Sequence, residues 1–138
     1  MSTKKTQSYN TQWAGQFFVA AELTRRGYRV SFTLGNCPQT DLMVVSPNGK
    51  PFRVEVKSQK SKNFWIVKKH DLMEDHFYVF VLIPETSPPE YHIMTCKDML
   101  RLMQEYADHM GERYDPRFGG FNWTAPLPHK NRWSILPA

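Results

Sequence analysis

DLMVVSPNGKPFRVEVKS, residues 41–58, holds two strand-like runs joined by Ser-Pro-Asn-Gly. These four residues have the composition of a type I turn, and Gly49 can take the left-handed conformation that closes a three-residue hairpin loop. In this register Asp41 falls directly opposite Glu55. A two-residue turn would shift the register by one residue and place the two carboxylates on opposite faces of the hairpin.

The three-residue loop sorts the hairpin side chains onto two faces. One face is wholly apolar and carries Leu42, Val44, Phe52, Val54 and Val56. The other face carries Asp41, Glu55, Arg53 and Lys57 beside Met43 and Val45. Two carboxylates about 5 Å apart repel each other by roughly 3 kcal/mol at an effective dielectric constant near 20. A cation close to both is therefore expected.

Two kinds of cation fit this position. Arg53 and Lys57 can neutralise the carboxylates as ordinary salt-bridge partners. A hard divalent ion does so better, because a small set of opposed oxygen ligands suits Mg²⁺, with Mn²⁺ as a substitute. Lys57 would then stand beside the metal and orient, or help to deprotonate, a water molecule. Phosphodiester hydrolysis needs this combination of a metal and a nearby cation.

The rest of the chain predicts one α/β domain with a mixed central sheet flanked by helices. The expected elements are a helix at 11–26, strands at 28–34, 41–46, 52–58 and 64–67, a helical turn at 70–75, strands at 77–83 and 91–95, and a helix at 97–110. We expect residues 1–10 to be a flexible basic tail and residues 11–110 to form the core domain. The Pro- and aromatic-rich residues 111–138 are expected to pack on this core or on the partner subunit of a homodimer.

Composition excludes several classes of protein. The 138 residues suffice for one core without disulfides or a structural metal. Cys37 and Cys96 lack metal-binding spacing, which favours reduced thiols in a cytoplasmic setting. No apolar run is long enough to span a membrane, and the first ten residues lack a hydrophobic signal region.

Charge is distributed unevenly along the chain. Residues 1–70 hold twelve Lys and Arg against three acids, a net charge of +9, whereas the remainder holds six against ten, a net charge of −4. The acid-poor half indicates a surface for the phosphates of DNA. The expected nucleic-acid contacts are Ser58, Gln59, Lys60, Lys62, Trp65, Lys68 and Lys69, with Trp65 stacking on a base. A solvated loop whose aromatic residues join the core would show the same pattern.

Glu22 lies on the first predicted helix and has two interpretations. It can pair with Arg25 and Arg26, which follow three and four residues later. It can also join the hairpin carboxylates, if its face of the helix packs over Met43 and Val45. The five histidines are scattered along the sequence and receive no role.

Glu22 on a helix, Asp41 three residues after Pro38, and then Glu55-Val56-Lys57 resemble the PD-(D/E)XK nuclease superfamily, within it archaeal-type Holliday junction resolvases and related restriction and repair endonucleases. The resemblance covers residues 13–58. It implies a restriction-endonuclease-like α-β-β-β-α-β core and Mg²⁺ dependence. It also implies metal ligation by Asp41, Glu55 and the carbonyl of Val56, with Lys57 at the water and Glu22 acting through water or on a second metal.

The resulting expectation is a metal-dependent endonuclease that hydrolyses the phosphodiester bonds of DNA, including branched or junction DNA. Its catalytic residues would be Glu22, Asp41, Glu55 and Lys57. The alternative is a nucleic-acid-binding module of the same fold without catalytic activity. A weaker option is a structural subunit that assembles through residues 111–138.

Overall fold

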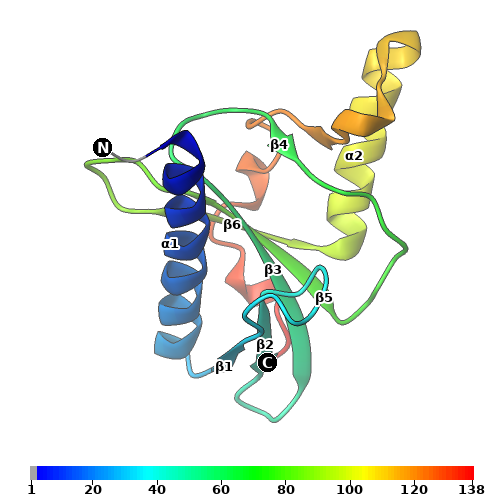
Figure 1. Ribbon diagram of the computed structural model, residues 1–138. Coiled ribbons are helices and arrows are strands. Elements are labelled where there is room, and N and C mark those ends of the chain that lie inside the picture. Colours follow the sequence, from blue (N-terminus) through cyan, green and yellow to red (C-terminus); the bar gives the residue numbers. More distant parts are fainter. Residues whose placement is uncertain (1–2) are drawn as a thin grey trace.

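The computed structural model describes residues 3–138 and has two helices, a five-stranded mixed sheet and a two-stranded sheet in one α/β domain (Figure 1). The helices are α1 (Lys4–Arg25) and α2 (Cys96–Met110), and the strands are β1 (Arg29–Phe32), β2 (Leu42–Val45), β3 (Pro51–Gln59), β4 (Trp65–Ile66), β5 (His76–Leu82), β6 (Glu90–Thr95) and β7 (Gly120–Phe121). Four short 3₁₀ helices follow α2, at Gly111–Arg113, Pro116–Phe118, Leu127–His129 and Trp133–Ile135.

The five strands of the main sheet lie in the order β1-β2-β3-β5-β6. Strands β3 and β5 run parallel, and every other neighbouring pair is antiparallel. The connection between β3 and β5 contains β4 and, across its described residues 60–75, no helix. The helical turn predicted at 70–75 is therefore wrong. This segment bonds to the sheet instead, because the Arg53 N–H donates to the Asp75 carbonyl at 2.8 Å.

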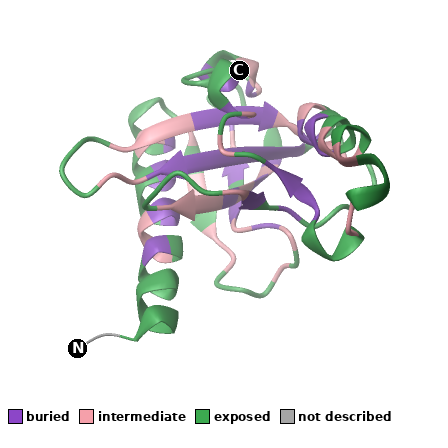
Figure 2. Cartoon of the chain, turned by 90° about the horizontal axis from the view of Figure 1, so that it is seen from above, coloured by how far each residue is buried: buried purple, intermediate pink, exposed green. Residues whose placement is uncertain are grey.

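The helices cover opposite faces of the sheet (Figures 1 and 2). What we call the α1 face carries Phe52, Val54 and Val56 of β3 and Phe77, Val79 and Val81 of β5, packed against Val19 and Leu23 of α1. The α2 face carries Glu55 and Lys57 of β3 and Tyr78 and Phe80 of β5. Tyr78 and Phe80 pack there against Met99 and Met103 of α2. Strand β5 is buried along its whole length, as the continuous apolar run predicted.

Helix α1 begins at Lys4, so most of the tail predicted at residues 1–10 is helical instead. The Thr3 side chain accepts a hydrogen bond from the Thr6 N–H at 3.1 Å and caps the helix. Residues 4–10, which follow this cap, include no glycine or proline that would interrupt the helix. Residues 1 and 2 lie outside the described part of the chain.

Residues 111–138 pack on the core, one of the two locations left open by the sequence. Strand β7 pairs with β4, and Trp133 and Leu136 are buried in the α1-face core. The Tyr28 and Ser46 hydroxyls donate to backbone carbonyls near the C-terminus. Both cysteines are free thiols. Across residues 3–138, neither helix combines the length and apolar character that a membrane crossing requires.

Candidate functional site

The hairpin register predicted from the turn is confirmed. Ser46 N–H donates to the Lys50 carbonyl at 2.8 Å, and Gly49 has a φ of 88°, the left-handed conformation that the loop requires. Leu42 pairs with Val54, as the three-residue loop dictates. The alternative register with a two-residue turn is therefore excluded.

The regular pairing ends just before the carboxylate of β2. The Asp41 N–H donates to the carbonyl of Val54, the residue that Leu42 already faces, so two successive residues oppose one, as in a β-bulge. The Asp41 carboxylate then accepts a hydrogen bond from the Val56 N–H at 2.7 Å. Asp41 is thus aimed at the Glu55–Val56 segment instead of forming the regular cross-strand pair that we expected. The role of the Val56 carbonyl stays a prediction.

Glu55 and Lys57 lie together on the α2 face. The Glu55 Oε1 is 3.7 Å from the Lys57 Nζ, and the Glu55 side chain is only 15% exposed. Burial raises the pKa of Asp41 and of Glu55, although the Lys57 ammonium opposes the rise at both and the Val56 N–H opposes it at Asp41. The Asp41 charge raises the pKa of Glu55 further, which indicates that the two carboxylates sense each other. Their site favours additional positive charge.

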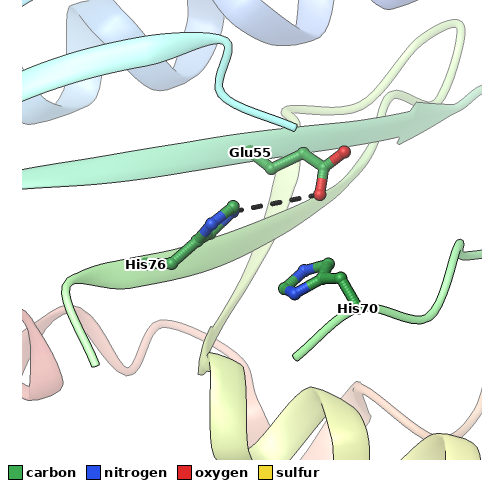
Figure 3. A group of neighbouring side chains, drawn as sticks. All are labelled: Glu55, His70 and His76. Atoms are coloured by element: carbon green, nitrogen blue, oxygen red, sulfur yellow. Dashed lines mark ion pairs between the residues drawn. The ribbon is translucent and has the colours of Figure 1, made fainter. Parts of the chain in front are cut away.

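A histidine-tyrosine group adjoins Glu55 on the side away from Lys57. Tyr78 pairs with Glu55 in the parallel register of β3 and β5. The rings of His70, His76 and Tyr78 are stacked, with centroids 4.9 Å apart for His76 and Tyr78 and 5.3 Å apart for the two histidines. The His70 Nε2 hydrogen-bonds to the Tyr78 hydroxyl. The Glu55 Oε2 is 4.0 Å from the His76 Nε2 (Figure 3).

His76 and His70 are functional candidates that the sequence analysis missed. His76 is 0% exposed, and neither ring nitrogen has a hydrogen-bond partner. A buried polar atom without a partner costs about 1–3 kcal/mol, so such an atom calls for an explanation. Burial lowers the pKa of His76 to about 4, helped by the adjacent His70 and Arg53, so its ring is neutral near pH 7. The sequence offered one signal for His76: it lies two residues before Tyr78 and therefore on the same face of β5.

Glu22 does not join the hairpin carboxylates. Helix α1 covers the α1 face, whereas Glu55 lies on the α2 face and Asp41 binds the Val56 N–H of the same strand. Glu22 instead pairs with Arg25 at 2.6 Å and with Arg26 at 2.9 Å, and the Arg25 hydrogen bond lowers its pKa. The expected packing over Met43 and Val45 is wrong because α1 is apolar nearly all round, and its helical wheel did not identify the buried side.

Two of the predicted nucleic-acid contacts belong to the core packing. Trp65 is 5% exposed and packs against Phe80, so it cannot stack on a base, and that prediction is wrong. The Ser58 side chain faces α1, because a Cβ atom added at Gly15 would lie only 1.7 Å from the Ser58 Oγ. Ser58 therefore points away from the carboxylates. The sequence pattern alone did not distinguish an interleaved aromatic residue from a core residue.

The remaining predicted contacts lie at the surface. Lys60, Lys62, Lys68 and Lys69 are exposed. The Lys62 Nζ lies 4.9 Å from the centroid of the Trp123 ring. The Gln59 side chain donates to the Asn63 carbonyl at 3.0 Å and so stabilises the loop after β3. Lys60 and Lys62 directly follow the strand that carries Glu55 and Lys57, whereas Lys68 and Lys69 follow β4.

A groove lies on the α2 face of the hairpin. Its volume is about 360 Å³, and its lining includes Arg29, Met43, Arg53 and Asp75. Met43 pairs with Arg53 and is 46% exposed. The hairpin part of the α2 face is therefore open, whereas helix α2 covers this face at β5. The Arg53 guanidinium binds Asp75 at 2.9 Å. The groove reaches Arg53, which precedes Glu55 by two residues on the same face of β3.

Comparisons with family models, with curated proteins and with solved structures gave no match to this chain. The functional interpretation accordingly rests on the geometry of the hairpin site and its surroundings.

Proposed function

We propose that this chain is a Mg²⁺-dependent nuclease that hydrolyses phosphodiester bonds of DNA. The observation that carries the proposal is the grouping of Asp41, Glu55 and Lys57 on one hairpin. The carboxylate of Asp41 is held against the Glu55–Val56 segment, and the Lys57 ammonium lies 3.7 Å from Glu55. Two half-buried carboxylates with raised pKa values favour a divalent cation with oxygen ligands.

Asp41 and Glu55 would hold the metal, with the Val56 carbonyl as a further oxygen ligand. When bound, Mg²⁺ polarises the phosphate and lowers the pKa of water. Lys57 orients the attacking water and stabilises the negative charge that develops on the phosphate oxygens. The lysines of the 60–69 loop and the open groove by Arg29 and Arg53 hold the DNA backbone.

We propose further that the core is a variant of the restriction-endonuclease-like fold. Its support is the order of elements: a helix, three antiparallel strands, and then a strand parallel to the third. The variant would lack the helix between the third and the parallel strand, since residues 60–75 form β4 and extended chain there. Helix α2 then comes after β6.

The alternative, a DNA-binding module without catalytic activity, is favoured by one observation. Glu22, one of the four residues expected at the catalytic site, is paired with Arg25 and Arg26 on the opposite side of the sheet. If the chain is a nuclease, its catalysis would depend on Asp41, Glu55 and Lys57 without Glu22.

A cleavage screen with linear, branched and single-stranded DNA tests the proposal. We expect cleavage with Mg²⁺ and none in EDTA. Asp41→Asn and Glu55→Gln should each abolish cleavage, and neither should lower the free energy of unfolding, since each removes a buried charge. Glu22→Gln is the matched control and should cleave like the wild type. Binding of DNA without cleavage of any substrate would establish the alternative.

A further inference from the structure

His76 presents an unpartnered polar side chain to a cluster of potential ligands. Its ring is completely buried, and both of its nitrogens lack a hydrogen-bond partner. One ligand atom from each of Glu55, His70 and His76 lies within 4.8 Å of the others. Figure 3 shows the two imidazole rings on the same side of the Glu55 carboxylate.

The proton positions at His70 prepare one nitrogen for a metal. The His70 Nδ1 lies 2.7 Å from the carbonyl of Asp71, which can only accept a hydrogen bond, so Nδ1 carries the proton. The Nε2 lone pair therefore accepts the Tyr78 hydroxyl, and a metal ion bound at this nitrogen would replace that hydrogen bond. Metal-bound histidines have this arrangement, with the second nitrogen donating to a carbonyl or carboxylate.

Side-chain movements of about half an ångström to just over one ångström would complete the geometry. Bonds of about 2.0–2.2 Å from nitrogen and oxygen to a tetrahedral metal place the ligand atoms roughly 3.5 Å apart. The Glu55 Oε2 and His76 Nε2 are 4.0 Å apart, so they need to approach each other by about half an ångström. His70 belongs to the extended segment between β4 and β5 and is only partly buried, which leaves it free to adjust.

We propose that Glu55, His70 and His76 form a binding site for a borderline divalent transition-metal ion such as Zn²⁺. Imidazole nitrogens suit Zn²⁺, whereas Mg²⁺ prefers oxygen ligands alone. Three protein ligands leave a fourth position for water. Glu55 belongs to both sites, because its Oε1 faces Lys57 and its Oε2 faces His76. The site shares Glu55 with the proposed Mg²⁺ site, takes its other two ligands from His70 and His76, and does not depend on nuclease activity.

Cobalt absorption spectroscopy tests this site in the full chain after removal of metals with a chelator. Co²⁺ added to the wild type should give visible absorption bands stronger than those of the hydrated ion, and Zn²⁺ should displace it. His76→Gln and His70→Gln should each weaken Co²⁺ binding by about 100-fold or more, since each removes a ligand. Asp41→Asn should keep the wild-type spectrum. His92→Gln removes another buried histidine on the neighbouring strand and is the matched control.

Three outcomes would overturn the proposal. They are a wild-type spectrum no different from that of hydrated Co²⁺, unchanged binding in both His70→Gln and His76→Gln, or loss of binding in Asp41→Asn alone. Near-ultraviolet circular dichroism checks that each variant is folded. If His76→Gln does not fold, His70→Gln decides the result, because His70 is not a core residue. Mg²⁺-dependent cleavage is measured separately, so failure of the transition-metal site leaves the proposed nuclease function standing.

Discussion

Lys57 is the residue whose chemical and structural roles can be separated most directly. Its ammonium lies 3.7 Å from Glu55 and opposes the burial that raises the pKa of both Asp41 and Glu55. If it acts on the water and the phosphate, Lys57→Ala should reduce single-turnover cleavage by about 100-fold or more. Mg²⁺ affinity, measured by calorimetric titration, should stay nearly unchanged. The exposed Lys97→Ala loses the same charge away from the site and should cleave normally. A parallel loss of metal affinity would make Lys57 a structural partner of the carboxylates.

His92 should contribute to the pH dependence of folding. It is buried on β6, donates from Nδ1 to the Phe80 carbonyl at 2.9 Å, and has an unpartnered Nε2. Burial lowers its pKa, assisted by Lys130 and opposed by the Phe80 hydrogen bond and by Glu90. Below the unfolded value near 6.5 the unfolded chain therefore binds more protons, and stability falls as the pH falls towards the folded pKa.

Urea unfolding at several values between pH 5 and 7.5 measures this effect. The free energy of unfolding should fall less steeply with decreasing pH in His92→Gln than in the wild type. Other buried histidines keep part of the slope in both proteins, so the difference between the two slopes is the relevant quantity. Identical slopes would show that His92 has the same pKa in the folded and unfolded chains.

At the scale of elements, the contact of α1 with β3 depends on Gly15. A Cβ at this position would lie 1.7 Å from the Oγ and 2.8 Å from the Cβ of Ser58. Gly15→Ala should therefore lower the free energy of unfolding, because overpacking costs about 1–3 kcal/mol, against about 1 kcal/mol gained in helix propensity. Ser58→Gly in the same chain should remove much of this loss. A double-mutant cycle in urea measures the coupling, with Ser8→Ala on the exposed part of α1 as control. Additive effects would mean that the helix packs elsewhere.

The hairpin was predictable and the helix packing was not, for a physical reason in each case. The turn residues pair Ser46 with Lys50 and so fix the register of the hairpin. Because side chains alternate along a strand, this register assigns each residue of β2 and β3 to one face of the sheet. Helix α1 carries apolar residues on several sides, and Phe17 remains 57% exposed in the folded chain. Its sequence therefore did not identify which side packs, and Glu22 was placed wrongly.

The histidine cluster was hidden for a different reason. His76 meets Glu55 only because β5 lies parallel to β3 in the register that pairs Tyr78 with Glu55. A parallel register is fixed by the long connection between the strands and by packing on both faces of the sheet. No short sequence motif records it. Candidate ligands from a hairpin can thus be found in sequence, whereas ligands from parallel neighbours need the fold.

For the whole molecule, the uneven charge acquires a spatial meaning. Residues 60–69 contain no acid and lie in the connection from β3 to β5, and all four of their lysines are exposed. If these lysines bind phosphates, each contact releases condensed counterions, and affinity falls steeply with salt. Replacing Lys60, Lys62, Lys68 or Lys69 by Gln should flatten the slope of log affinity against log salt by about 0.9 on duplex DNA.

This prediction is tested in the Asp41→Asn background, where DNA binding can be measured without cleavage. Lys130→Gln is the matched control, because the Lys130 ammonium pairs with Glu90 at 3.3 Å on the β6 edge, and its slope should equal that of the parent. With Asp41 restored, the four lysine variants should regain cleavage at low salt, since Asp41, Glu55 and Lys57 are then intact and only backbone contacts are weakened. Parental slopes in all four variants would show that these lysines form a solvated face, and the DNA contacts would then have to lie along the groove lined by Arg29 and Arg53.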